Sequence, residues 1–422
     1  MGSELAPKPL SINPFKLSMP MGATLAFLGV KGCMPLMHGA QGCASFTKVF
    51  FTRHFNEPIA IQTTAVNDIT AVFDGGEYGV TTAVENITKK VTPSLIGLYS
   101  TGLTETKGDD LRGAADKIES KIVWANTPDF EGSFESGWSV SVLAMIEQLI
   151  KETSEIEPKK ITVIPNVSMS ALEVERLKEF LYDMGFLRVF ALPDISTSLD
   201  GYLGEKQGQI SSGGIEVDDL EALGNSEIVV TVGMSVKDCG DAFVAKNQKI
   251  KHLHMDSLGG LINTDNFVSM LMEAGYTPNG RIKRWRARLQ DAMLDTHFVI
   301  GKHSFLIAVE PDNARALADT LREAGAKIES ITLPQKVNFG FENYKNVSIG
   351  DLEDVSKNLA NIDVIVTNEH GKSIATSQHK TILLRGFPIF EALGHSLKSD
   401  ILYEGSAQLL FETANLIEEH HH

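Results

Sequence analysis

Short apolar runs alternate with amphipathic segments through most of this chain, and the alternation limits the folds that it can adopt. The run at 159–165 (KKITVIP) is continuous, as in a strand buried on both faces, and 170–185 has the spacing of a helix. Strand patterns recur at 188–193 and 227–232, with a predicted helix at 217–223 between them. Strands that alternate with helices predict parallel sheets covered by helices on both faces.

The same pattern occurs before and after this region, so we expect more than one sheet. Further strands are predicted at 94–100, 121–126, 304–309, 327–333 and 363–367. Further helices are predicted at 19–30, 81–90, 137–151, 281–294, 312–324 and 351–360. A chain of 422 residues is too long for one hydrophobic core. We therefore predict an α/β protein with three doubly wound, Rossmann-like domains and mainly parallel sheets.

A charged linker at 152–158 places the first boundary, and the basic helix after 280 places the second. The predicted domains are 1–157, 158–280 and 281–397. The amphipathic tail at 405–419 predicts a terminal helix that packs back on another domain, and we assign 398–422 to the first domain. Residues 1–13 are expected to be a loose lead-in.

The composition excludes several classes of function. The formal net charge of −16 argues against a nucleic-acid partner or an anionic membrane surface. No apolar run approaches the roughly 20 residues of a membrane span, and no signal peptide is recognisable. Three cysteines, at 33, 43 and 239, form no disulfide framework and indicate a reducing compartment. We therefore expect a cytoplasmic protein, and we assign no role to the terminal histidines.

One short motif, 38–43 (HGAQGC), combines two glycines with a cysteine before a predicted helix at 44–55. Cys43 falls at or just before the first turn, where the helix dipole and unpaired backbone N–H groups lower the pKa of a thiol. The thiolate is the form that ligates iron. The alternative is a buried cysteine that acts as a small hydrophobic residue, which is common for a lone cysteine and is expected for Cys33 and Cys239.

Three other motifs give weaker evidence for a binding site. The fragment at 371–373 (GKS) lacks the first glycine of a P-loop, because Val366 occupies that position. The glycines at 75–79 (GGEYG) follow no clear strand and predict a turn. His252 and His254 could share one face of a strand, but no third metal ligand is near in the sequence, so a surface or half-buried pair is favoured.

The number of cysteines restricts any iron–sulfur site. A cluster of four irons usually takes four cysteine thiolates. This chain has three cysteines and no C-x-x-C pair. If Cys43 binds a cluster, the remaining ligands must come from another polypeptide.

Several segments together resemble the nitrogenase component 1 family, which includes the molybdenum–iron protein β subunit and the related scaffold subunits of cofactor assembly. The resemblance covers nearly the whole chain. It rests on segments at 35–58 (PLMHGAQGCASFTKVFFTRHFNEP), 100–105 with 108–110, 126–137 (NTPDFEGSFESG), 289–298 (LQDAMLDTHF), 350–354 and 385–388.

Departures from the family pattern favour the scaffold. In the catalytic β subunit, three cysteines bind an eight-iron cluster. Ser18 stands where that subunit has the cysteine of its Lys-x-Cys-x-Pro segment, and Gly102 stands where it has the cysteine of a Thr-Cys pair. Only Cys43 remains, which suits one ligand of a [4Fe-4S] cluster shared with a partner chain. His38 matches the motif and is expected to be a hydrogen-bonded core residue rather than a ligand.

The resemblance implies a cofactor-assembly scaffold rather than an enzyme. Its partners would be a NifE-type subunit in an α2β2 heterotetramer, the Fe protein NifH, NifB or a cluster carrier, and the apo molybdenum–iron protein. The transient iron–molybdenum cofactor precursor would be bound mainly by the NifE-type partner while molybdenum and homocitrate are inserted. The alternative is the β subunit of a nitrogenase-like reductase, acting on dinitrogen or on tetrapyrroles. A metal-free α/β binding protein, with Cys43 in its core, is a third hypothesis.

Overall fold

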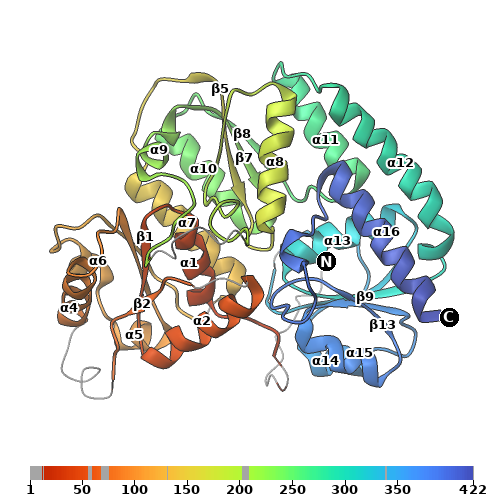
Figure 1. Ribbon diagram of the computed structural model, residues 1–422, viewed down its shortest axis with the longest axis horizontal. Coiled ribbons are helices and arrows are strands. Elements are labelled where there is room, and N and C mark those ends of the chain that lie inside the picture. The colour runs from red at the N-terminus through yellow and green to blue at the C-terminus, as the bar shows by residue number, and fades with distance from the viewer. Residues whose placement is uncertain are drawn as a thin grey trace.

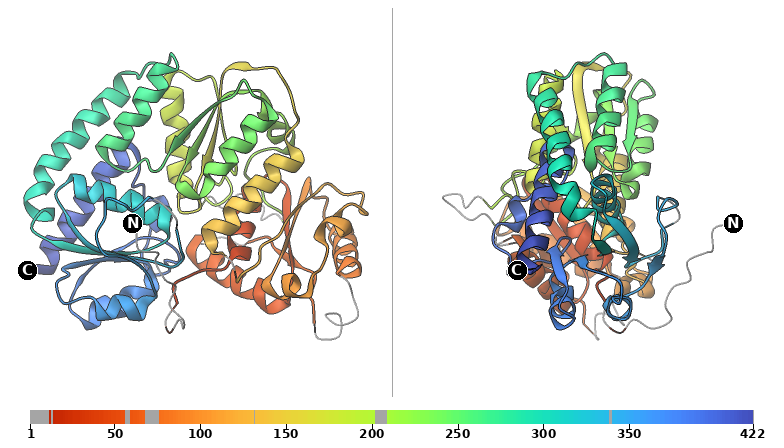
Figure 2. Two further views of the ribbon diagram at one scale, coloured as in Figure 1. Left: turned by 180° about the vertical axis from the view of Figure 1, so that it is seen from behind. Right: turned by 90° about the vertical axis from the view of Figure 1, so that its right-hand side faces the viewer.

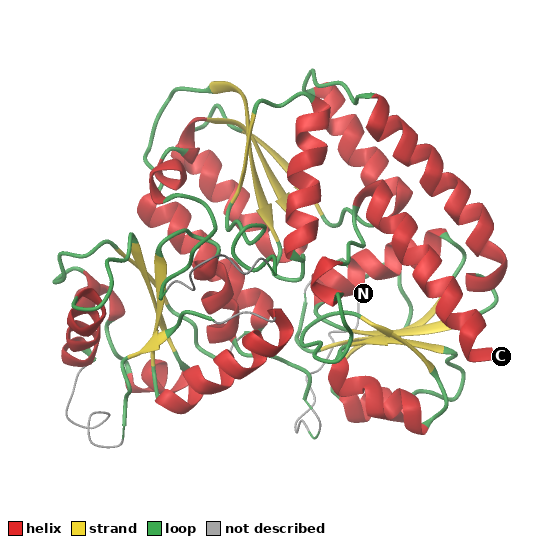
Figure 3. Ribbon diagram, viewed as in Figure 1, coloured by secondary structure: helices red, strands yellow, loops and turns green. Residues whose placement is uncertain are grey.

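The structure is a computed structural model that describes residues 12, 14–55, 59–67, 76–130, 132–201, 209–337 and 340–421. Most of the expected lead-in, together with residues 56–58 and Gly75 of the quoted motifs, lies outside these residues. Three separate sheets, surrounded by helices, account for the described fold (Figures 1 and 3). Each described strand pairs with its neighbours in parallel. The predicted fold class is confirmed.

The first sheet has the order β2-β1-β3-β4. Its strands are β1 (Cys33–His38), β2 (Gln62–Thr63), β3 (Leu95–Ser100) and β4 (Ile122–Ala125). One face packs on α1 (Met19–Leu28) and α7 (Phe134–Leu149), and the other on α4 (Glu77–Thr88) and α6 (Leu111–Ala115). The remaining helices of this part are α2 (Gln41–Phe55) and α5 (Gly102–Lys107).

The second sheet has the order β6-β5-β7-β8. Its strands are β5 (Glu157–Pro165), β6 (Arg188–Ala191), β7 (Ser226–Val232) and β8 (Lys251–Met255). Its helices are α8 (Ala171–Met184), α9 (Val217–Glu221), α10 (Lys237–Lys246) and α11 (Gly260–Glu273), with 3-10 turns η1 (Leu223–Asn225) and η2 (Met234–Val236). From behind, α7 and α10 lie side by side between the first two sheets (Figure 2).

The third sheet has the order β11-β10-β9-β12-β13. Its strands are β9 (Ser304–Ala308), β10 (Lys327–Leu333), β11 (Val347–Ile349), β12 (Val364–Thr367) and β13 (Thr381–Leu384). The helices are α13 (Pro311–Glu323), α14 (Leu352–Lys357) and α15 (Lys372–Ser377), with 3-10 turns η3 (Glu369–Gly371) and η4 (His395–Leu397). The third sheet thus follows the doubly wound plan of the other two.

The terminal helix does not pack where we expected. Helix α16 (Leu402–His421) lies along α12 (Gly280–Ile300) and also contacts α11 and β13 (Figure 1). Its apolar face, which includes Leu409, Leu410 and Ile417, is buried there. The assignment of 398–422 to the first domain is therefore wrong for this helix, because its apolar partners belong to the second and third sheets. The boundaries after residues 157 and 280 remain predictions.

Other differences are local. The sequence pattern gave no strand at Cys33–His38, because Pro35 interrupts the apolar run and proline disfavours central strands. Pairing with β3 over the whole length of β1, together with complete burial, overrides this preference. Residues 77–79 form the start of α4 rather than a turn, and Gly76 caps that helix with a φ of 88° that favours glycine. Among the described residues, every helix is too short or too polar to cross a bilayer.

Candidate functional site

The carboxyl edge of the first sheet brings together the segments that the sequence singled out. Strands β1 and β3 are neighbours in this sheet, but β1 connects to β2 on one side and β3 connects to β4 on the other. Ligands of open parallel sheets bind outside the carboxyl ends of the strands at such a point. Cys43 follows β1, and Gly102 follows β3. Gly39 brings the two connections into contact, since a Cβ there would lie 2.5 Å from Cγ2 of Thr101.

Cys43 lies inside the first turn of α2 and is exposed. The helix begins at Gln41, two residues before the cysteine and three before the predicted start. Its buried face consists of Ala44, Thr47, Phe51 and Phe55. On the outer face, Phe46 is 69% exposed and Val49 is 54% exposed. The thiol therefore belongs to an apolar surface rather than to the core.

The two positions where the resemblance implied missing cysteines also meet at this edge. Ser18 caps α1 and is half-buried, and the following backbone N–H of Met19 donates to Oδ1 of Asp129 at 3.1 Å. A Cβ on Gly102 would lie 3.4 Å from Cβ of the same Asp129. Asp129 follows β4, so it connects the end of that strand to the segment after β3 and to the start of α1. Asp129 belongs to the family-like segment 126–137, but its contacts could not be predicted from the sequence.

His38 ends β1 and is held on several sides. Its Nε2 lies 2.9 Å from Oδ2 of Asp109, and its Nδ1 lies 2.9 Å from Oγ1 of Thr64. The hydroxyls of Thr101 and Thr104 donate to its backbone oxygen at 3.1 and 2.9 Å. Both ring nitrogens have partners within the protein, so His38 is a hydrogen-bonded core residue, as expected.

The other cysteines and the histidine pair lie elsewhere. Cys33 is buried in β1 and Cys239 in α10, and burial raises the pKa of both thiols, that of Cys239 to about 12. His252 and His254 share one face of β8, where both ring systems contact Oγ1 of Thr231. The described part of the chain contains no group of three or more His, Cys, Asp or Glu side chains placed to hold a metal ion.

An aromatic cluster connects α2 to the third sheet. Phe387, in the segment after β13, lies between Phe51 and Phe134 with ring centroids 5.5 and 5.2 Å away. The ring of His54 lies 4.5 Å from that of Phe387 and 4.4 Å from that of His395. Burial is the main reason why the pKa of His54 is well below its usual value. The helix that carries Cys43 is thus anchored in two parts of the molecule.

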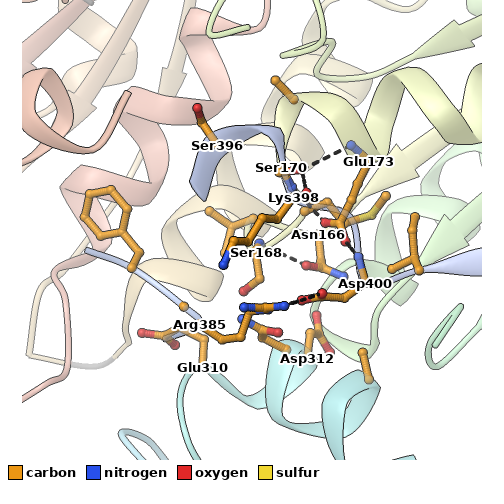
Figure 4. A pocket seen from close by; sticks show the side chains of 18 of the residues that line it. Asn166, Ser168, Ser170, Glu173, Glu310, Asp312, Arg385, Ser396, Lys398 and Asp400 are labelled. Carbon is orange, nitrogen blue, oxygen red and sulfur yellow. Dashed lines mark hydrogen bonds and ion pairs between the residues drawn. The ribbon is translucent and has the colours of Figure 1, made fainter. Parts of the chain in front are cut away.

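A cavity of about 110 Å³ lies where the second and third sheets face α1 and α2 (Figure 4). The arginine and the lysine of its lining are both paired with carboxylates. Arg385 contacts Asp400 and Glu412, and Lys398 contacts Glu412. Burial is the main cause that raises the pKa of Glu173 to about 7 and that of Glu310 to about 8. The positive charges of Arg385 and Lys398 are therefore neutralised within the lining.

The chain can therefore offer a metal cluster one accessible thiol. Cys33 is buried in β1 and Cys239 is buried in α10, so neither can join Cys43. A single bond from Cys43 fits a cluster completed by another chain, and the exposed apolar side chains beside it fit a protein contact there. Two further large hydrophobic residues, Leu103 and Phe130, are exposed at the same edge, at 51% and 63%.

Comparison with known proteins identifies the family of this chain. The family model for nitrogenase component 1 type oxidoreductases matches residues 18–418. The nitrogenase iron-molybdenum cofactor biosynthesis proteins NifN of Mesorhizobium japonicum and Bradyrhizobium diazoefficiens are 35% and 34% identical to this chain, covering 98% and 97% of it and 92% and 90% of their own lengths. NifN of Klebsiella pneumoniae is 31% identical, covering 98% of this chain and 93% of its own.

A solved structure, nitrogenase Cp1 at pH 6.5, has the same fold. Its TM-score is 0.92 at 28% identity, and the match covers 99% of this chain and 95% of that one. The resemblance inferred from the sequence motifs is confirmed over nearly the whole chain. The chain belongs to the nitrogenase component 1 type oxidoreductase family.

Proposed function

We propose that this chain is the NifN-type subunit of a scaffold for assembly of the nitrogenase iron–molybdenum cofactor. In this role it contributes Cys43 as one ligand of a [4Fe-4S] cluster, and a NifE-type partner contributes the others. The complex is an α2β2 heterotetramer that receives the precursor from NifB or a cluster carrier. With the Fe protein NifH, molybdenum and homocitrate are inserted on it, and the finished cofactor passes to the apo molybdenum–iron protein.

The observation that carries this proposal is the set of side chains at the carboxyl edge of the first sheet. Cys43 is exposed there, while the neighbouring positions 18 and 102 hold a serine and a glycine. A catalytic β subunit would need thiols at both positions for the larger cluster. Similarity to NifN over nearly the whole chain supports the same assignment.

The chemistry of the site follows from what surrounds Cys43. When bound, the cluster would supply one-electron transfer. The first turn of α2 presents the exposed thiol at the surface, where a partner chain can reach it. Phe46 and Val49 on the same helix, with Leu103 and Phe130 at the same edge of the sheet, would exclude water once the partner covers them.

Co-expression with a NifE-type partner tests the proposal. Iron is quantified in the purified complex, and EPR spectra are recorded for the wild type and for Cys43→Ala after reduction. We expect four irons per interface and a four-iron signal that Cys43→Ala removes or reshapes while the heterotetramer still forms. Eight irons per interface, or an unchanged spectrum in the variant, would contradict the proposal.

Activity assays separate the scaffold from the reductase alternative. We expect the purified complex, supplied with Fe protein and ATP, to show no turnover of acetylene, dinitrogen or tetrapyrroles. The same complex should activate apo molybdenum–iron protein when it carries the precursor and receives molybdate and homocitrate. Sustained substrate reduction without such activation would favour the reductase.

A further inference from the structure

The strongest unassigned feature is the hydrogen-bond network around His38. Its imidazole lies between Thr64 and Asp109, and the side chains of His38 and Asp109 are buried. A carboxylate only accepts hydrogen bonds, so Nε2 carries the proton and donates to Asp109. In the neutral ring, Nδ1 then accepts from the Thr64 hydroxyl. Nζ of Lys107 lies 3.2 Å from the other oxygen of Asp109, which fixes that carboxylate.

The same residues fix the backbone of the loop before Cys43. The N–H of Gly39 donates to Oγ1 of Thr64 at 3.2 Å, and the hydroxyl of Thr63 donates to the Gly39 oxygen at 2.7 Å. The N–H of Val66 donates to that oxygen at 3.0 Å. No rotation about the bonds of Gly39 can therefore occur without breaking several contacts. The direction in which α2 leaves the sheet is set by this loop.

The network also joins this loop to the one that carries Gly102. Oγ1 of Thr101 and Oγ1 of Thr104 both donate to the backbone oxygen of His38. Asp109 lies just after α5, in the turn that leads to α6. The imidazole of His38 thus connects the end of β1 to the segment after β2 and to the turn between α5 and α6, and the backbone oxygen of His38 adds the connection to the end of β3.

We infer that His38 and Asp109 are positioning residues, which set the placement of the Cys43 thiol relative to the partner chain. This inference rests on the proposed function, since it concerns the geometry of the proposed cluster ligand. The properties of an iron–sulfur cluster depend on how its ligands are oriented and hydrogen-bonded. Loosening the network would therefore change the spectrum and reduction potential of the cluster while the cluster remains bound.

The second sheet supplies a matched control. His254 in β8 also lies between a threonine and an aspartate, with Nδ1 2.9 Å from Oγ1 of Thr231 and Nε2 3.1 Å from Oδ1 of Asp256. It has the same chemistry in another sheet of the fold. His254→Gln therefore reports what a lost Thr–His–Asp network does in general, without acting on the loop of Cys43.

The experiment uses the complex with the NifE-type partner and compares His38→Ala, His38→Gln, Asp109→Asn, His254→Gln and Cys43→Ala. Iron content, the EPR signal of the reduced state and its midpoint potential are measured. We expect His38→Ala and Asp109→Asn to reshape the signal and shift the midpoint at wild-type iron content. His38→Gln, which keeps one donor within reach of Asp109, should lie closer to the wild type. His254→Gln should match the wild type.

The outcomes separate the two proposals. If Cys43→Ala alters the signal while His38→Ala and Asp109→Asn match the wild type, the positioning role is wrong and the ligand assignment stands. A signal changed equally by His254→Gln would also overturn the positioning role, because it would reflect general loosening. If Cys43→Ala changes nothing, the proposed function fails and this inference fails with it. Should His38→Ala not assemble, the nearly isosteric Asp109→Asn decides.

Discussion

Helices α1 and α7 cross at two glycines, and replacing Gly137 by alanine tests how much this crossing contributes to stability. A Cβ on Gly137 would lie 1.9 Å from the backbone oxygen of Met19. Reciprocally, a Cβ on Gly22 would lie 2.0 Å from the backbone oxygen of Phe134. In both cases the obstacle is main chain, which cannot move away by changing a rotamer. The added methyl must push the two helices apart.

The size of the effect follows from this geometry. The Gly137 Cβ would be about 1.5 Å closer than the 3.4 Å at which ordinary van der Waals contact begins. Inserting a methyl group into a close-packed core costs about 1–3 kcal/mol, and the upper end applies because no side chain can yield. Alanine has a better helix propensity than glycine, and this difference offsets about 1 kcal/mol of the cost. We therefore expect Gly137→Ala to lower the free energy of unfolding by about 2 kcal/mol.

Urea denaturation of the chain, followed by circular dichroism, measures this loss. Gly280→Ala is the matched control, because Gly280 is also helical but has open space around its Cβ position. It should be neutral or slightly stabilising. The double variant of Gly22 and Gly137 should lose less than the sum of the single variants, since one outward shift of α1 relieves both contacts. If Gly137→Ala were as stable as Gly280→Ala, the close crossing would not exist in solution.

Three further predictions concern the site and its support. A thiol reagent should modify Cys43 rapidly in the isolated chain, and Cys33 and Cys239 only in denaturant, because both are buried; mass spectrometry of digests would detect fast labelling of either one, which would contradict the structure. Phe387→Ala should lower the free energy of unfolding by about 3 kcal/mol, since its ring packs among four other aromatic rings; a change near zero in urea denaturation would refute the anchoring of α2. Burial raises the pKa of Glu310 to about 8 from about 4.3 in the unfolded chain, so the folded state binds its proton more tightly and stability falls as the pH rises through this window. Glu310→Gln should therefore be more stable than the wild type at pH 8, with a gain that disappears towards pH 4; a gain independent of pH would show that the carboxyl is not responsible.

Much of the fold follows from the order of residues along the chain. Continuous apolar runs such as the one in β5 must be covered on both faces, and the helices between them supply the cover. Helix α8 was predictable in detail, because Ser170 and Glu173 form a capping box at its start and Gly185 ends it with a φ of 104°. These sequence signals involve only a few neighbouring residues, so they can be recognised without knowing the rest of the structure.

The sequence also singled out Cys43 as a candidate ligand, because the number of cysteines and the glycines of its loop can be read without the fold. Only the tertiary structure decided that the outer face of α2 is exposed around it and that Ser18, Gly102 and Asp129 meet at one edge. The same holds for β1, where pairing with β3 prevails over Pro35, and for α16, which packs along α12. In each case the deciding contact joins residues that are far apart in the chain. The free energy of such a contact depends on both segments, so it cannot be predicted from the sequence of either one.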